Sequence, residues 1–129
     1  MSDDRRVYLE MIQTVIARLA SNSFVLKGWT VTLATALLGF AGRQQDAQLA
    51  CLTLLPALAF WALDAFYLAQ ERQYRELFVL ARDGDSKVFI LDVPDLKFAE
   101  WRAAAFHVTT LGLHGLIVAL AAYLSFAWR

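Results

Sequence analysis

The run of twenty residues from Leu49 to Leu68 is apolar almost throughout, yet it contains the carboxylate of Asp64. As a helix, a run of this length is long enough to cross a bilayer whose hydrocarbon core is about 30 Å thick. The 129-residue chain is 59% hydrophobic with a mean hydropathy of +0.47, which is too apolar for an ordinary soluble domain of this size. A carboxylate at the centre of a span costs about 2.5–3.5 kcal/mol, so Asp64 should be paired, near an interface, or part of a polar pathway. The sequence therefore predicts an all-α integral membrane protein.

Hydrophobic periodicity divides the chain into one amphipathic helix and three spans, all within a single membrane domain, 1–129. Residues 4–22 carry apolar side chains at three- and four-residue spacing, and Ser21-Asn22-Ser23 offers cap or hinge chemistry after them. The expected segments are an amphipathic cytoplasmic helix over 4–22, a first span over 24–41, a second span with a cytoplasmic extension over 47–83, a cytoplasmic loop and short helix over 84–101, and a third span over 103–128.

The second span should continue as a helix beyond the membrane, because no glycine or proline occurs between Leu68 and Arg82. At 1.5 Å per residue, a helix from Ala47 to Arg82 is about 54 Å long, so about 20 Å should project from the hydrocarbon. Pro56 frees the carbonyl of Leu52 and predicts a kink within the span. The projecting part has an apolar stripe that needs a partner, for which the N-terminal amphipathic helix is the best candidate; the stripe consists of Tyr67, Tyr74, Leu77, Phe78 and Ala81.

The segment after the projecting helix begins with Asp83-Gly84-Asp85-Ser86, which should end the helix. The following residues, 87–91, permit a strand, but a lone strand would have no pairing partner, so we expect a buried or membrane-touching loop. Asp92-Val93-Pro94 is a plausible helix entry that should lead into the third span.

The basic residues predict the orientation of the chain in a bacterial inner membrane. With the N-terminus inside, only Arg43 and Arg129 lie on the outer side. The cytoplasmic side receives all the others: Arg5, Arg6, Arg18, Lys27, Arg72, Arg75, Arg82, Lys87, Lys97 and Arg102. This asymmetry places the C-terminus outside.

Lys27 is the predicted partner of Asp64. The first two spans should form a hairpin centred near Gln45, which lies about 18 residues after Lys27 and 19 before Asp64. Both side chains would therefore lie about 27 Å from the turn, near the inner edge of the hydrocarbon. An ion pair would remove the cost of burying Asp64, and it would act either as a structural clamp or as part of a gate or ion pathway.

Three polar side chains lie on one side of the third span, since His107 and His114 are seven residues apart with Thr110 between them. They could form hydrogen bonds between helices, or a polar stripe that faces an oligomer axis or pore. Two histidines have too few companions for a metal site, because Cys51 should lie toward the opposite membrane face. We therefore expect neither metal nor cofactor.

A cluster of basic and aromatic residues lies on or after the projecting helix, namely Arg72, Tyr74, Arg75, Arg82 and Lys87. Such a cluster could contact a phosphate-bearing ligand or a soluble partner on the cytoplasmic side. Nearby acids neutralise much of this positive charge, which also makes an ordinary solvated juxtamembrane surface a sufficient explanation.

Small residues repeat along the first and third spans and are typical of close helix packing. The two stripes are Gly28, Thr32, Thr35 and Gly39, and Gly112, Gly115, Ala119 and Ala122. Three spans offer little polar interior for a pathway within one chain, so conduction would require a symmetric homo-oligomer with a pore between subunits. The chain carries no glycine-rich phosphate loop, nucleophile elbow or paired metal-ligand motif, so we do not expect an enzyme.

Two blocks of sequence resemble a family of small bacterial inner-membrane proteins. They read Asn22-Ser23-Phe24-Val25-Leu26-Lys27-Gly28-Trp29 and Phe60-Trp61-Ala62-Leu63-Asp64-Ala65-Phe66-Tyr67-Leu68. The likeness covers the N-terminal helix and the first two spans and implies architecture rather than chemistry. The size and layout also look like those of membrane effectors of bacterial anti-phage signalling, in which a nucleotide signal controls a channel or a membrane-disrupting oligomer.

The leading hypothesis is therefore an oligomeric membrane effector or channel-like protein controlled through its cytoplasmic helices by a partner or nucleotide. The alternative is a non-conducting membrane scaffold that docks a soluble partner.

Overall fold

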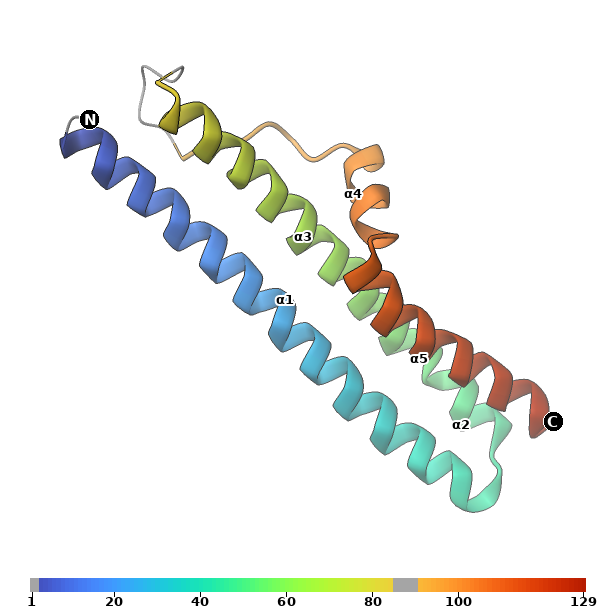
Figure 1. Ribbon diagram of the computed structural model, residues 1–129. Coiled ribbons are helices and arrows are strands. Elements are labelled where there is room, and N and C mark those ends of the chain that lie inside the picture. The colour runs from blue at the N-terminus through green and yellow to red at the C-terminus, as the bar shows by residue number, and fades with distance from the viewer. Residues whose placement is uncertain (1–2, 85–90) are drawn as a thin grey trace.

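The fold is a long helical hairpin with a third membrane-length helix packed against one end (Figure 1). The computed structural model describes residues 3–84 and 91–129, which contain helices and no strand. The helices are α1 (Asp3–Gln44), α2 (Ala47–Leu52), α3 (Leu54–Arg82), α4 (Phe98–Ala105) and α5 (Val108–Ala127). Three segments are long and apolar enough to cross a membrane: α1, α2 with α3, and α5. The all-helical prediction and the three membrane-length helices are thus confirmed.

Helix α1 runs without a break through the expected cap or hinge at Ser21-Asn22-Ser23, so the predicted division into helices 4–22 and 24–41 is wrong. Its 42 residues give a length of about 63 Å. The helix continues because no glycine or proline interrupts it before Gly28 and because the side chain of Ser23 is bonded to Asp64 instead of capping a helix end. Both halves of α1 therefore form one continuous helix.

The turn of the hairpin lies where the sequence predicted it, at Gln45 and Asp46. Gln45 adopts the left-handed backbone conformation with φ of 50°. The Asp46 carboxylate caps α2 by accepting hydrogen bonds from the backbone N–H groups of Gln48 and Leu49 at 3.0 and 3.2 Å. This turn fixes the register in which α1 meets α2 and α3.

The boundary between α2 and α3 falls at Thr53, one turn before Pro56. Pro56 has no N–H to donate to the carbonyl of Leu52, so the helical hydrogen-bond ladder loses one bond there. Bonds on either side persist, from the Thr53 N–H to Leu49 and from the Ala57 N–H to the Thr53 carbonyl, both at 3.2 Å. The interruption lies at the place expected from the proline, and α2 and α3 together make one membrane-length segment.

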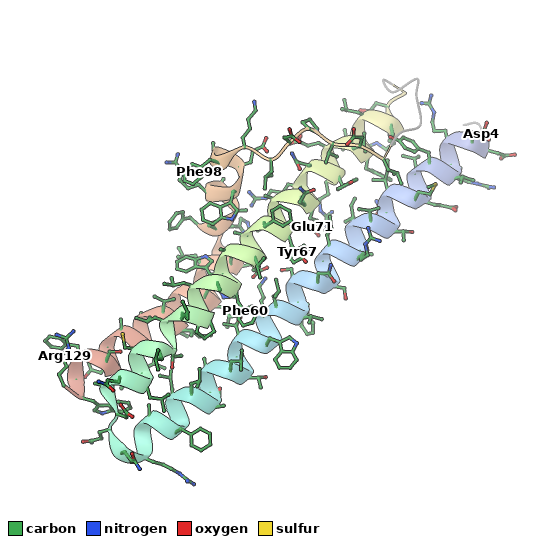
Figure 2. The ribbon with its side chains drawn as sticks, turned by 180° about the vertical axis from the view of Figure 1, so that it is seen from behind. Asp4, Phe60, Tyr67, Glu71, Phe98 and Arg129 are labelled. Atoms are coloured by element: carbon green, nitrogen blue, oxygen red, sulfur yellow. The ribbon has the colours of Figure 1, made fainter. Side chains whose placement is uncertain are left out.

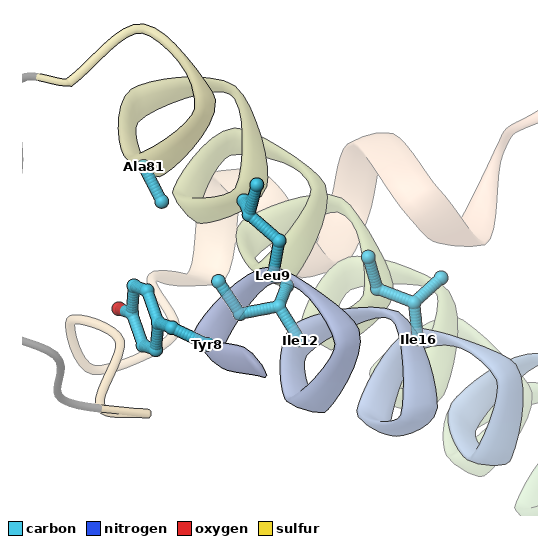
Figure 3. Packing of buried hydrophobic residues seen from close by; sticks show 5 residues of the cluster. All are labelled: Tyr8, Leu9, Ile12, Ile16 and Ala81. Atoms are coloured by element: carbon cyan, nitrogen blue, oxygen red, sulfur yellow. The ribbon is translucent and has the colours of Figure 1, made fainter. Parts of the chain in front are cut away.

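The N-terminal part of α1 and the C-terminal part of α3 pack together into a two-helix stalk, defined here as residues 3–20 and 70–82. The sequence predicts that this stalk lies in the cytoplasm. Tyr8, Leu9, Ile12 and Ile16 are buried against Ala81 (Figure 3). Partly buried side chains of Tyr74, Leu77, Phe78 and Leu91 complete this cluster. The N-terminal helix is therefore the partner of the projecting stripe, as predicted.

Two polar contacts fasten the end of the stalk. The guanidinium of Arg5 donates to the carbonyl of Ala81 at 3.3 Å. Its positive charge is also favourable there, because the C-terminal end of α3 carries the negative end of the helix dipole. The Tyr74 hydroxyl donates to the carbonyl of Leu91 at 3.1 Å. The first bond joins the two helices of the stalk, and the second joins α3 to the segment that follows the stalk.

The predicted third span, 103–128, is divided in the structure by a break at Phe106 and His107. In an uninterrupted helix the Ala105 carbonyl would accept from the N–H of Thr109. Here the Trp61 indole donates to that carbonyl at 2.9 Å, while the Thr109 N–H donates to Nδ1 of His107 at 3.4 Å. The Ala105 carbonyl and the Thr109 N–H therefore both have other partners, and a new helix, α5, begins at Val108.

The expected helix entry at Asp92-Val93-Pro94 is also displaced. Residues 91–97 are irregular and α4 starts at Phe98, where the Glu100 carboxylate accepts from the N–H of Lys97 at 3.3 Å. Most of the expected loop, including Lys87, lies outside the described residues, so its predicted structure stays a prediction.

Candidate functional site

One buried carboxylate joins the three membrane-length helices. Asp64 of α3 has no exposed surface and accepts hydrogen bonds from side chains of α1 and α5. From α1, the Ser23 hydroxyl donates to Oδ1 and the Lys27 ammonium lies 2.6 Å from Oδ2. From α5, Nε2 of His114 lies 2.8 Å from Oδ2. We call these four side chains the Asp64 network.

Helical spacing on α1 brings the two α1 members of the network together. Ser23 and Lys27 are four residues apart and so lie on the same face, and the Lys27 ammonium donates to the Ser23 hydroxyl at 2.8 Å. The Lys27 side chain keeps 25% of its surface exposed, whereas Asp64 and His114 keep none. The predicted Lys27–Asp64 ion pair is therefore present, with the lysine at the outer edge of the network and the carboxylate inside it.

The α5 member is held by stacking as well as by its hydrogen bond. The rings of Trp61 and His114 are nearly parallel, with an interplanar angle of 9° and centroids 6.5 Å apart. The Trp61 indole is in turn anchored on the Ala105 carbonyl. His114 therefore lies between the carboxylate it contacts and an aromatic ring that restricts its orientation.

Two polar atoms beside the network have no hydrogen-bond partner among the described residues. They are Nδ1 of His114 and the hydroxyl oxygen of Thr110, one helical turn earlier on α5. Both are buried, and such groups are costly unless they serve a purpose or bind water. Each is a buried group to which a water molecule could bond.

The network lies at a defined level of the hairpin. Lys27 and Asp64 are 18 and 19 residues from the turn at Gln45, so both lie about 27 Å from it. Beyond this level α1 and α3 continue as the stalk. The network thus occupies the junction between the apolar part of the hairpin and the stalk.

His107 does not join His114 in a polar stripe, and the prediction that both line one side of a third span is wrong for this residue. Because the helix breaks before Val108, His107 becomes the N-cap of α5, and its Nδ1 lies 3.0 Å from the Thr109 hydroxyl. Thr110 and His114 are buried, whereas His107 is half-buried. Hydrogen bonding between helices, one of the two interpretations of these residues, is confirmed for His114 alone.

The predicted cytoplasmic ligand cluster does not converge on one place. Arg75 pairs with Glu71 at 3.1 Å and Arg82 with the adjacent Asp83 at 3.4 Å. Arg72 instead lines a hollow that also contains Glu76 and Glu100, and the Tyr74 hydroxyl is bonded to backbone. Lys87 lies outside the described residues. These contacts are typical of a solvated charged surface.

The described residues contain no group of three or more His, Cys, Asp or Glu side chains placed to hold a metal ion. The Asp64 network instead contains a carboxylate, an ammonium, a hydroxyl and an imidazole. It is a polar cluster of opposite charges between helices.

No protein-family model, curated protein or solved structure matches this chain.

Ser23 and His114 are the members of the network that the sequence did not reveal as partners of Asp64. Ser23 could have been found from its four-residue spacing to Lys27. His114 could have been found because a histidine inside a largely apolar span needs a polar partner on another helix.

Proposed function

We propose that this protein is an oligomeric membrane effector with a channel-like output, controlled through its cytoplasmic stalk. The observation that carries the proposal is that a single buried carboxylate ties α1, α3 and α5 together where the stalk meets the membrane-length part of the hairpin. In this proposal the protein lies in a bacterial inner membrane, with the N-terminus and stalk in the cytoplasm and the C-terminus outside.

The continuity of α1 supports a mechanical route from stalk to membrane. The stalk cluster around Ile12 and the network around Lys27 lie on the same unbroken helix. Ala81 and Asp64 likewise lie on the single helix α3. A partner or nucleotide that changes the packing of the stalk would therefore act directly on the helices that hold the network.

The exposed small residues support assembly into a homo-oligomer. A side chain added at Gly28, Gly39 or Gly112 would meet nothing within 4 Å in the single chain, so these positions do not serve helix packing within it. The other members of the α1 stripe, Thr32 and Thr35, are also exposed. Such surfaces permit close approach of a second membrane helix.

A pathway for ions would have to form between copies. Asp64 and His114 are fully enclosed, Ser23 and Lys27 are partly exposed, and the three long helices present mostly apolar side chains outward. A symmetric oligomer could bring the Lys27 edge of each network toward a common axis. The layout shared with anti-phage membrane effectors is the reason to propose defence as the setting, with a nucleotide as a candidate trigger.

The second candidate is a non-conducting scaffold that docks a soluble partner. It is favoured by a shallow hollow of about 470 Å³ on the stalk, where Val79 and Leu80 are 43% and 49% exposed beside Arg75 and Glu76. Apolar side chains flanked by charges are typical of a protein-binding surface.

The two candidates are separated by ion flux through vesicles that contain the purified full-length protein, measured with and without added nucleotides. The effector proposal predicts an oligomer in detergent and a measurable flux that changes in His114→Gln but not in the control His107→Gln. A clean monomer that stays silent under all tested nucleotides would contradict the effector proposal and favour the scaffold.

A further inference from the structure

A groove lined by aromatic side chains lies where α4 meets α3. It has a volume of about 220 Å³ and is almost wholly apolar, with the lining residues Leu58, Trp61, Ala62, Trp101, Ala105 and Phe106. Both indole N–H groups are already bonded to backbone, that of Trp61 to Ala105 and that of Trp101 to the Ala62 carbonyl at 3.0 Å. The rings therefore offer an apolar surface that is fixed in place.

Two basic residues are helical neighbours of residues that line this groove. Arg102 lies one helical turn before Phe106, and Lys97 lies four residues before Trp101, so each cation is next to a residue that lines the groove. Neither side-chain cation has an ion-pair partner in residues 3–84 and 91–129. The carboxylate of α4, Glu100, is engaged elsewhere, with the N–H of Lys97 and the amide of Gln73.

The position of the groove fits the inner leaflet of a membrane. Leu58 and Ala62 are 13 and 17 residues from Gln45, so the groove lies about 20–26 Å from the outer turn. Phe106 lines the groove, and the ring of Phe98 stacks on the lining residue Trp101. Phe98 and Phe106 are 72% and 59% exposed, and Figure 2 shows Phe98 on α4, away from α1. Aromatic side chains at this level are typical of the membrane–water interface.

We propose that this groove binds an anionic phospholipid of the inner leaflet, with an acyl chain against Trp61 and Trp101 and the headgroup phosphate at Arg102 and Lys97. The apolar lining matches the acyl chain, and the two cations without partners match the phosphate. The proposal rests on the membrane placement given above but not on conduction. A lipid bound in the groove would be separated from the Asp64 network only by Trp61, which lines the groove and stacks on His114. In this proposal α4 is a lipid-sensing element.

The test measures quenching of tryptophan fluorescence by lipids with brominated acyl chains, using full-length protein in mixed micelles. Trp29→Phe and Trp128→Phe leave Trp61 and Trp101 as the emitters. Brominated phosphatidylglycerol should quench at lower mole fraction than brominated phosphatidylcholine. In Arg102→Gln this preference should fall about fivefold, the factor that corresponds to one basic residue at an anionic surface. The control Arg43→Gln, at the outer turn, should keep the full preference.

Ala62→Leu tests the groove itself, because Ala62 is exposed and its side chain points into the groove lining without belonging to a buried cluster. It should lower quenching by both lipids at least twofold, with helix content unchanged by circular dichroism. Equal quenching by the two lipids in the parent protein would overturn the proposal. So would an Ala62→Leu variant that changes the oligomeric state while quenching stays the same, since the groove would then be an interface between copies. Neither result depends on ion flux, so failure here is distinct from failure of the effector proposal.

Discussion

Asp64 is tolerated in an apolar environment because its two oxygens accept from three donors on two other helices. Burial of an unpaired carboxylate at mid-span costs about 2.5–3.5 kcal/mol. Hydrogen bonds to a charged group each contribute about 1.5–3 kcal/mol, so the three together offset that cost. The residue that looked anomalous in the sequence is thus the acceptor at the centre of the fold.

The two histidines of the third segment have different roles, and the same substitution at each should reveal this. His114→Ser removes a donor to Asp64 and leaves space beside Trp61, so the free energy of unfolding should fall by about 2 kcal/mol or more. His107→Ser places a residue type that is preferred at an N-cap and should be nearly neutral.

The free energy of unfolding of each variant is measured in detergent, with circular dichroism as the signal. Equal losses at the two positions would contradict the separate roles described for His107 and His114.

At the scale of helices, the stalk illustrates what a local pattern can predict. The apolar stripes of the two stalk helices follow from three- and four-residue spacing, and their pairing follows because the hairpin turn at Gln45 places them side by side. The Lys27–Asp64 pair was predictable for the same reason, since both are nearly equidistant from that turn.

Two of the errors at this scale come from contacts between residues far apart in the sequence. Nothing near Ala105 marks the end of a helix, because the break depends on the Trp61 indole, 44 residues away. Conversely, serine is a preferred cap residue, but the Ser23 hydroxyl donates to Asp64, 41 residues away, and α1 continues. Helix propensity is a weak guide to helix ends wherever such a long-range contact determines them.

Packing of the stalk can be tested with neighbouring residues on α1. Ile12 has no exposed surface, so Ile12→Ala should lower the free energy of unfolding by about 2–4 kcal/mol. Met11 is 48% exposed, and Met11→Ala should change it by less than about 0.5 kcal/mol. Thermal unfolding in detergent, together with proteolysis of the N-terminal segment, measures both effects. A large loss in Met11→Ala would show that the opposite face of α1 is covered, for instance by another copy.

For the whole molecule, the arrangement separates a stalk at one end from the turn of the hairpin and the C-terminus at the other (Figure 1). Gly42 and Trp128 approach each other near that turn, which places the end of α5 beside the end of α1. If the basic residues set the orientation, the N-terminus and C-terminus face opposite sides of the membrane.

Cysteine labelling tests this orientation directly, because Cys51 is the only cysteine and can be removed as Cys51→Ser. In that background, Asp4→Cys should react with an impermeant maleimide only in inverted vesicles, and Arg129→Cys only in right-side-out cells. The opposite pattern would reverse the proposed placement of the stalk.

The central claim is that α1, α3 and α5 are held together through the single carboxylate of Asp64. The most direct test is the free energy of unfolding of Ser23→Ala, Lys27→Met and His114→Leu, each measured alone and again in the Asp64→Leu background. Because all three side chains act through one acceptor, each should be destabilising alone, and its cost should fall by about 1–3 kcal/mol once Asp64 is absent. Costs that stay the same in both backgrounds would show that the three contacts are independent of Asp64, and would contradict the account.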